Sequence, residues 1–337
     1  SIAVKDEMTD YTEPTFAGFT IANPNLAGIG LLNQLALTTY LNGVQQEVKT
    51  GSGQLVFVNS DLLNGHSAQV VGFVPNLPFD ELKLAVNQTV GVTLGTTEVY
   101  NVVIEKLCAG SLSCNSTAWL NYPDFPVFID NANTGISGAA CVACIVTDTK
   151  NVIDDMDSTY ATIEMMAGAA STGSVAVQDA ISTYPVGSSI GFTIRDMNNM
   201  LQVNLFNTLT VSTFLDGVLQ ESAAANNLLE VQLLNLVIDT NLNGVYNVGF
   251  KTTLPYDEVK LTVGSLAGTA NEIRVYGAFL DTRGATGGSL NCFRTDPDFA
   301  ATYLNVPVNG NVNTNDIVPA GSLYGAAVAQ AGNPSAC

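Results

Sequence analysis

The second half of this 337-residue sequence repeats the first half. Three blocks recur in the same order: Ser1–Ile21 matches Ser174–Ile194, Leu35–Glu47 matches Leu209–Glu221, and Val70–Val86 matches Asn247–Val263. The offset changes little, from 173 (Ser1 to Ser174) to 177 (Val70 to Asn247), so the alignment needs only short gaps. A shorter echo, Pro-Asp-Phe at 123–125 and again at 297–299, extends the repeat. Self-similarity at a constant period indicates a repeated structural unit, so we predict two copies of one domain.

Each copy has the residue pattern of an all-β domain. Apolar and polar residues alternate in Leu35–Leu41, Leu209–Leu215 and Glu258–Val263, which is the periodicity of half-buried strands. Residue pairs that favour tight turns follow such runs, for example Asn42-Gly43 and Asp216-Gly217. β-branched and aromatic residues dominate, and no long segment has helical periodicity. The pattern gives about eight strands per copy, which predicts a two-sheet sandwich of jelly-roll type.

We predict two sandwiches joined by a connector. Copy one covers residues 1–107, copy two covers residues 144–281, and a connector rich in Cys, Asn and Gly occupies 108–143. Residues 282–337 are interpreted as a second connector and the start of a further β module. Copy two is preceded by Cys144–Gly173, which has no counterpart before copy one, so copy one is expected to leave a sheet edge open. We interpret the chain as part of a string of modules, whose missing strands come from the same chain or an adjacent subunit.

The composition excludes several classes of protein. Hydrophobic residues make up 47% and charged residues 12% of the chain, which is not the composition of a disordered segment. The 30 acidic and 11 basic residues give a net charge of −19, which repels nucleic acids and anionic membranes and favours divalent cations. No stretch reads as a membrane span. The one histidine, His66, lies in a polar turn, so a catalytic triad or multi-histidine metal site would depend on it.

Two adjacent acidic pairs could be mistaken for catalytic carboxylates. Asp80-Glu81 and Asp257-Glu258 stand at matching positions of the two copies. Adjacent residues on a strand point to opposite faces of a sheet, so the two carboxylates of a pair do not converge on one bond. Lys83 and Lys260 follow on the same face as the two glutamates, which favours ion pairs on the solvent side. We therefore expect the protein not to be an enzyme.

Four stretches of copy two carry a resemblance to a known repeat: Tyr184–Ile194, Phe214–Gly217, Tyr256–Leu266 and Arg274–Phe279. Together they resemble modules of the very large cell-surface adhesins of gliding Bacteroidota, of the SprB-like kind. The segment Val306–Gly325 also resembles the linker modules of such proteins. The resemblance implies an extracellular location on the bacterial cell surface and a role in adhesion, gliding-type motility or filament formation. It supplies no catalytic residues.

An acidic loop at Asn151–Ile163 is a candidate calcium site. Hard oxygen ligands crowded on one loop suit calcium, which takes six to eight of them. The loop also resembles the metal loop of galactose-binding-like jelly-roll modules, Asp-Gly-x-x-x-Thr-x-Ala, although Asp155 replaces the glycine. In that family an acid on the last strand completes the site, and Glu272 has the matching place. The expected calcium ligands are therefore Asp154, Asp155, Asp157, Thr159 and Glu272, and the alternative is a solvated acidic turn.

The six cysteines lie in or next to the predicted connectors: Cys108, Cys114, Cys141, Cys144, Cys292 and Cys337. Four thiolates within Cys108–Cys144 could in principle bind zinc. The extracellular context implied by the resemblance favours disulfides, which persist in oxidising compartments. The sequence does not choose among the three possible pairings of those four cysteines, and free thiols are a further alternative.

Two functional hypotheses remain after these exclusions. The first is a structural and adhesive segment of a long multi-domain extracellular surface protein or filament. The alternative is a carbohydrate-binding module with a calcium-stabilised jelly-roll fold and surface polysaccharide as its partner. This alternative needs exposed aromatic residues, and the one tryptophan, Trp119, lies in the predicted connector. Fold analogy by itself is a weak argument for sugar binding.

Overall fold

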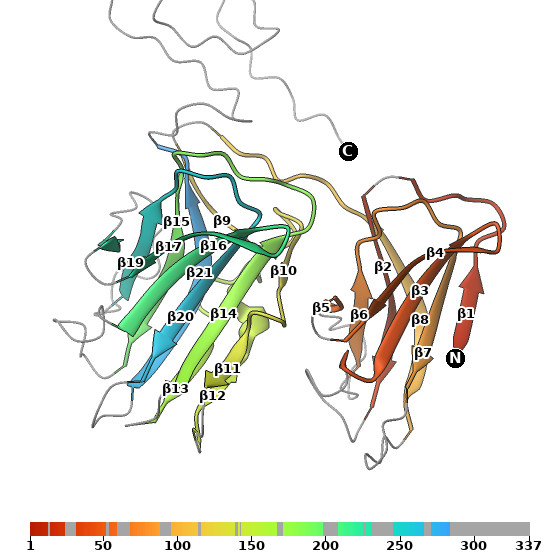
Figure 1. Cartoon of the computed structure of the whole chain (residues 1–337), viewed down its shortest axis with the longest axis horizontal. Coiled ribbons are helices and arrows are strands. Elements are labelled where there is room, and N and C mark those ends of the chain that lie inside the picture. The colour runs from red at the N-terminus through yellow and green to blue at the C-terminus, as the bar shows by residue number, and fades with distance from the viewer. Residues whose placement is uncertain are drawn as a thin grey trace, which may run out of the picture.

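The computed structural model describes residues 1–12, 14–23, 32–51, 54–58, 68–87, 96–113, 116–138, 141, 143–166, 171–197, 208–224, 227–230, 245–265 and 271–283. Within these ranges the chain forms strands β1 to β21 and one 3-10 helix, η1 (Thr149–Val152). The strands build two β-sandwiches, one from each copy of the repeat (Figure 1). The predicted all-β fold of two tandem jelly-roll sandwiches is confirmed. His66 lies outside the described residues.

Copy one forms a sandwich of two four-stranded antiparallel sheets. The strand order of the first sheet is β1 (Ile2–Lys5), β7 (Glu81–Val86), β3 (Leu35–Leu41) and β4 (Val44–Thr50). The strand order of the second sheet is β5 (Val56–Val58), β6 (Gln69–Phe73), β2 (Thr15–Ala22) and β8 (Glu98–Lys106). Because successive strands repeatedly cross between the sheets, the path of the chain is that of a jelly roll.

Copy two repeats both sheets in the same order. Four strands correspond to β1, β7, β3 and β4: β14 (Ser171–Asp179), β20 (Glu258–Gly264), β16 (Leu209–Leu215) and β17 (Val218–Ala224). Four more correspond to β5, β6, β2 and β8: β18 (Leu229–Glu230), β19 (Val245–Lys251), β15 (Ser189–Asp196) and β21 (Asn271–Asp281). The register is also shared, since Phe19 stands opposite Val71 in copy one and Phe192 stands opposite Val248 in copy two.

Copy two carries additional strands at two edges, which raise its sheets to six and seven strands. β10 (Val127–Ile129) and β11 (Gly135–Gly138) pair with β14, the counterpart of β1. β13 (Ala161–Met165) and β9 (Thr117–Trp119) pair with β21, the counterpart of β8. β12 (Ile145–Thr147) extends the same sheet by pairing with β13. As far as the described strands show, the edges at β1 and β8 are open in copy one, and the corresponding edges of copy two are therefore covered.

Three of the additional strands correct the predicted domain boundaries. β9, β10 and β11 belong to residues 108–143, the predicted connector. The prediction that this segment only links the copies is wrong, because its backbone forms hydrogen-bonded ladders with both edges of copy two. The sequence pattern does not reveal these strands, since they are only three or four residues long and lie between Asn, Gly and Ser residues. The predicted connector and further module at 282–337 lie outside the described residues from 284 onward.

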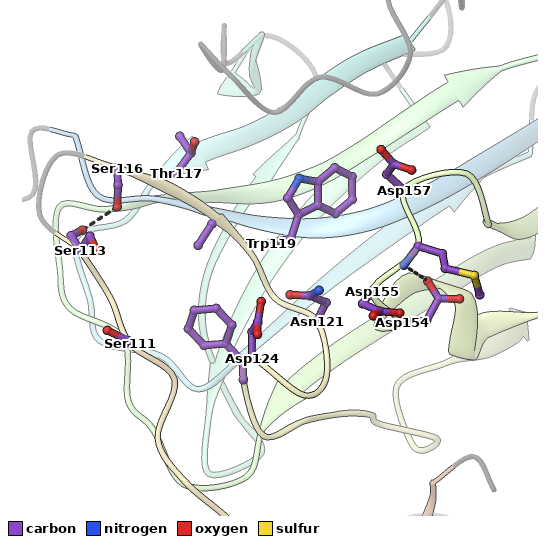
Figure 2. A pocket seen from close by; sticks show the side chains of 13 residues that line it. Ser111, Ser113, Ser116, Thr117, Trp119, Asn121, Asp124, Asp154, Asp155 and Asp157 are labelled. Carbon is purple, nitrogen blue, oxygen red and sulfur yellow. Dashed lines mark hydrogen bonds between the residues drawn. The ribbon is translucent and has the colours of Figure 1, made fainter. Parts of the chain in front are cut away.

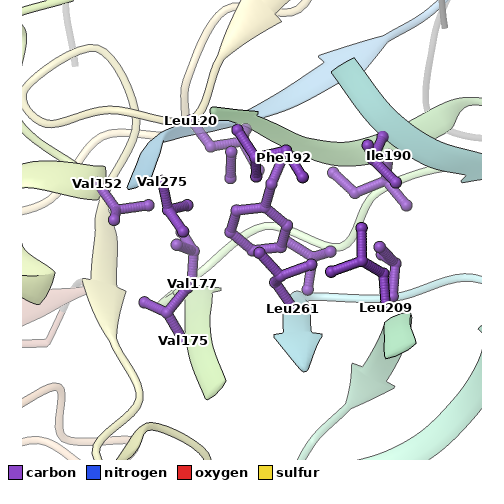
Figure 3. Packing of buried hydrophobic residues seen from close by; sticks show 14 of the residues in the cluster. Leu120, Val152, Val175, Val177, Ile190, Phe192, Leu209, Leu261 and Val275 are labelled. Carbon is purple, nitrogen blue, oxygen red and sulfur yellow. The ribbon is translucent and has the colours of Figure 1, made fainter. Parts of the chain in front are cut away.

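Each sandwich encloses an apolar core between its two sheets. Phe19 and Phe192 occupy the same place in their cores and are 1% and 0% exposed. Phe73 and Phe250 are also buried, as the repeat predicts. The core of copy two is larger because it includes residues such as Val152 that lie outside the matched blocks (Figure 3).

The hairpin that joins β3 to β4 recurs between β16 and β17. Its turn residues have left-handed backbone conformations, with φ of 51° and 78° at Asn42-Gly43 and 50° and 75° at Asp216-Gly217. Asn, Asp and Gly tolerate this conformation best, which explains their place in the repeat. Leu41 and Leu215, which the repeat predicts as core residues, are only half-buried because each ends its strand at this turn.

A small apolar cluster joins the two copies. Phe16, Val70 and Leu107 of copy one pack with Phe128 of β10, and all four side chains are buried. The rings of Phe16 and Phe128 are stacked, with their centroids 5.7 Å apart. Figure 1 shows β10 on the side of copy two that faces copy one. Since β10 is also a strand of copy two, the cluster attaches copy one directly to a sheet of copy two.

Candidate functional site

A groove of about 790 Å³ runs along one side of copy two (Figure 2). One wall comes from the segment around β9, which contributes Trp119, Asn121 and Asp124 together with several serines. The other wall is the acidic loop that follows η1, with Asp154, Asp155, Met156 and Asp157. The groove therefore combines an aromatic ring with amide, hydroxyl and carboxylate groups. We call it the β9 groove.

Trp119 is held in the β9 groove by strand pairing and by a glycine. β9 pairs with β21, and this places Trp119 opposite Phe279. The indole packs over Gly277, where an added Cβ atom would collide with the ring. In Figure 2 the ring lies above Asn121, and Asp157 of the acidic loop lies to its right. Glycine at position 277 is therefore what lets the tryptophan lie flat on the strand.

The acidic loop gathers oxygen atoms around one hydroxyl group. Both carboxylate oxygens of Asp154 lie 2.8 Å from Oγ1 of Thr159, and the carbonyl oxygen of Met156 lies 2.9 Å from the same atom. A threonine hydroxyl has one proton and donates one hydrogen bond at a time, so the other close oxygens share no proton with it. Crowded hard oxygens of this kind suit a cation. Asp155 and Asp157 are exposed on the same loop.

Glu272 does not join this loop in a carboxylate cluster. It lies on β21 opposite Glu164 of β13, and its Oε1 atom accepts a hydrogen bond of 3.2 Å from Nε of Arg274. Within the described ranges, no three His, Cys, Asp or Glu side chains are placed to hold a metal ion together. The predicted set of acids is therefore not assembled. Calcium also binds carbonyl and hydroxyl oxygens, so binding at the loop of Asp154 and Thr159 stays a prediction.

A second polar cluster surrounds Glu258, where β10 and β11 cover the edge of copy two. Glu258 is 2% exposed, and its Oε1 accepts a hydrogen bond of 2.8 Å from Nδ2 of Asn133. Nζ of Lys260 donates to Oδ1 of Asn133 at 3.2 Å. Burial, and then the neighbouring charge of Asp130, raise the pKa of Glu258 to about 8. The predicted ion pair on the solvent side is wrong for copy two, because the segment 108–143 buries this glutamate.

The aspartates beside these glutamates act in the hairpin turns. Oδ2 of Asp80 accepts a hydrogen bond of 3.0 Å from the backbone N–H of Asn42. Oδ2 of Asp257 accepts one of 3.0 Å from the N–H of Asp216, the matching residue of copy two. Burial raises the pKa of Asp257 above its ordinary value. The aspartate of the repeated pair therefore has a structural explanation in both copies, namely stabilisation of a turn.

Two of the predicted disulfide cysteines are joined in the described part of the chain. Cys141 and Cys144 form a disulfide with a Cα–Cα distance of 5.5 Å. Cys108 is also disulfide-bonded. Three further candidates lie outside the described residues: Cys114, Cys292 and Cys337. The Cys141–Cys144 bond closes a short loop between β11 and β12, next to the strands that cover the edges of copy two.

No protein-family model matches the sequence, and no curated protein is significantly similar to it. A solved structure of a carbohydrate-binding module, CBM32-3 from a family 31 glycoside hydrolase of Clostridium perfringens, superposes with a TM-score of 0.23. The two sequences are 14% identical over a match that covers 43% of this chain and 86% of that module. In the described ranges, no helix is long and apolar enough to cross a membrane.

Proposed function

We propose that this chain is a structural and adhesive segment of a long extracellular surface protein of a bacterium, in which successive β-sandwiches keep a fixed relative orientation. The observation that carries the proposal is the packed junction between the copies. Phe128 is a residue of β10 and stacks on Phe16 of copy one, so the segment between the modules is part of both. A junction of this kind differs from a flexible linker, whose residues have no tertiary packing.

A polar contact beside the junction supports the same proposal. The hydroxyl group of Tyr122, in the segment before β10, donates a hydrogen bond to the carboxylate of Glu105 on β8. Burial and this hydrogen bond raise the pKa of Tyr122 to about 12. The tyrosine therefore stays protonated, and the contact persists, at any physiological pH.

The net charge of −19 favours a soluble and extended assembly over collapse onto anionic surfaces. The resemblance to SprB-like adhesins supports the assignment to the cell surface.

The fixed orientation can be tested by measuring distances between spin labels, one placed on each sandwich. The full chain should give a single narrow distance distribution, and Phe128→Ala should broaden it because the stacked contact is lost. Tyr100→Ala is a matched control, since Tyr100 is an exposed aromatic residue on β8 that lies outside the junction cluster. A broad distribution in the unchanged chain would contradict the proposal.

Adhesion is tested in parallel by the force needed to detach beads coated with the chain from bacterial cells, with uncoated beads as the control.

A second candidate function, carbohydrate binding, is favoured by the β9 groove. Sugar rings stack on aromatic side chains and bond to amides and carboxylates, and the groove presents Trp119, Asn121 and Asp124 in its wall. A glycan array with the full chain tests this function. Asp124→Ala should remove any specific signal, because it takes a carboxylate out of the wall of the β9 groove. Asp124 is exposed, so its replacement leaves the fold intact. Asp10→Ala, at an exposed aspartate of copy one, is the control.

A further inference from the structure

The first strands of the two copies have the same sequence pattern and opposite environments. Ile2 and Val4 of β1 are each 44% exposed. Their counterparts in β14, Val175 and Val177, are 0% and 1% exposed and belong to the core of copy two. Apolar side chains in positions that are core positions in the other copy indicate a surface that is covered in the functional assembly.

The outer edge of β14 shows what such a cover does. Ile129 of β10 stands opposite Val177, and Phe128 stands opposite Gln178. On this edge both backbone polar groups of Ala176 are hydrogen-bonded. The carbonyl of Ala176 accepts a hydrogen bond of 3.1 Å from the N–H of Asp130, and its N–H donates one of 3.0 Å to Oγ1 of Thr134. Ala3 is the counterpart of Ala176 in β1. Among the described strands, β1 pairs only with β7, so the same outward backbone groups of β1 have no strand partner there.

The other sheet of copy one has a matching open edge. Every residue of β8 is at least partly exposed, whereas only Glu272 and Arg274 in β21 are not buried. β13 and β9 pair with the outer edge of β21, and the described strands include no counterpart beside β8. β1 and β8 are the outer strands of their sheets, as β14 and β21 would be without the additional strands. As far as the described strands show, one side of the copy one sandwich is therefore open in both of its layers.

The repeat identifies the kind of strand that fits this side. In copy two the covering strand β10 follows directly after Pro123–Phe125. The same tripeptide recurs at Pro297–Phe299, an offset of 174 (123 to 297), which lies within the offsets that relate the two copies. The tripeptide that leads into the covering segment therefore follows both copies, although the blocks that match between the copies do not include β10. We infer that the open side of copy one, along β1, binds a β10-type strand from another copy of this repeat, with an isoleucine opposite Val4 as Ile129 stands opposite Val177. This is strand addition to an exposed sheet edge.

A synthetic peptide of residues 124–138, which contains β10 and β11, tests the inference on the full 337-residue chain. The labelled peptide should bind with a stoichiometry of one, and hydrogen exchange should show new protection of Ile2–Lys5. Val4→Lys should weaken binding at least tenfold, because a charge would be placed in the covered face. Val48→Lys is the matched control: Val48 is also 44% exposed and lies on β4, at the opposite edge of the same sheet.

Three results would overturn the inference. They are equal binding of a scrambled peptide, unchanged binding by the Val4→Lys chain, and protection that appears in β14 instead of β1. The inference rests on the proposed function, since both concern an array of modules, yet the two fail separately. If the peptide does not bind and the distance distribution between the sandwiches is narrow, only the inference is overturned. A broad distribution with intact peptide binding would remove only the fixed orientation.

Discussion

The two copies share their strand order and register, and they differ in what covers their edges. Residues that are equivalent in the repeat can therefore be exposed in copy one and buried in copy two, as Val4 and Val177 are. The cover of copy two comes from residues 117–165, which lie outside the matched blocks. The repeated sequence therefore determines the topology of a module, and the segment that flanks the module determines how much of the module's surface is buried.

The largest expected effect concerns the two equivalent core phenylalanines. Phe192→Ala should lower the free energy of unfolding of copy two by about 3–5 kcal/mol, because it leaves a cavity in a closely packed core. Phe19→Ala should lower the stability of copy one by a similar amount. Calorimetry of the full chain should show two transitions, with copy one unfolding at the lower temperature because more of its apolar surface is exposed. If either variant shifts both transitions equally, the two copies unfold as one unit and the comparison between them fails.

Internal similarity makes the topology of these sandwiches predictable from sequence. The blocks that match between the copies contain strands such as β2 and β15 with their alternating apolar residues, and the turn pair Asn42-Gly43 recurs as Asp216-Gly217. Phe19 and Phe192 follow from the same alignment, because an apolar residue conserved between copies in a strand with one buried face belongs to the core. Local residue pattern was sufficient in these cases.

The additional strands and the candidate site were not predictable in the same way. β9, β10 and β11 are held by pairing with distant strands, and three or four residues carry too little periodicity to reveal a strand. The β9 groove depends on Gly277, far along the chain, which makes room for the ring of Trp119. A glycine within an otherwise apolar strand pattern was a signal of close approach. In the structure Gly277 takes the place that Asn101 has in copy one. The oxygen cluster at Asp154 and Thr159 was predictable from spacing, whereas the position of Glu272 depends on tertiary pairing.

Calcium provides a second way to separate the copies, because only copy two has the acidic loop. If the oxygens of Asp154, Met156 and Thr159 bind calcium, free calcium at about 100 times the dissociation constant should stabilise copy two by about 2.7 kcal/mol. The transition of copy one should not move and serves as the internal control. Asp154→Ala should abolish the shift in calorimetry and the heat of binding in titration. A calcium shift that survives Asp154→Ala would place the ion elsewhere.

Glu258 and Glu81 test how the covering strands change the pH dependence of stability. Folding raises the pKa of Glu258 from 4.5 to about 8, so the folded state keeps a proton that the unfolded state releases. The free energy of unfolding of copy two should therefore fall as the pH rises from about 4.5 to about 8. Glu258→Gln should remove this fall and make copy two more stable at pH 8 by on the order of 2 kcal/mol. Denaturant unfolding at pH 4.5 and pH 8 measures it.

The control for this experiment is Glu81→Gln, which changes the matching glutamate of copy one. Glu81 is half-buried and has no covering strand beside it in the described part of the structure. The substitution should therefore change the free energy of unfolding of copy one at pH 8 by no more than about 0.5 kcal/mol. Equal effects of the two substitutions would show that burial by β10 and β11 does not cause the shift at Glu258.

The smallest effect is expected where the copies are alike. Gly43 and Gly217 have φ of 78° and 75°, and an added Cβ atom at either position would meet no atom within 4 Å. Replacement by alanine therefore adds no steric contact and costs only the left-handed backbone conformation, about 1 kcal/mol in each copy. Gly43→Ala and Gly217→Ala should lower the two transitions by the same free energy, measured by denaturant unfolding of the full chain. Unequal losses would mean that the covering strands of copy two also act on its distant hairpin, and that the copies differ in more than their covered edges.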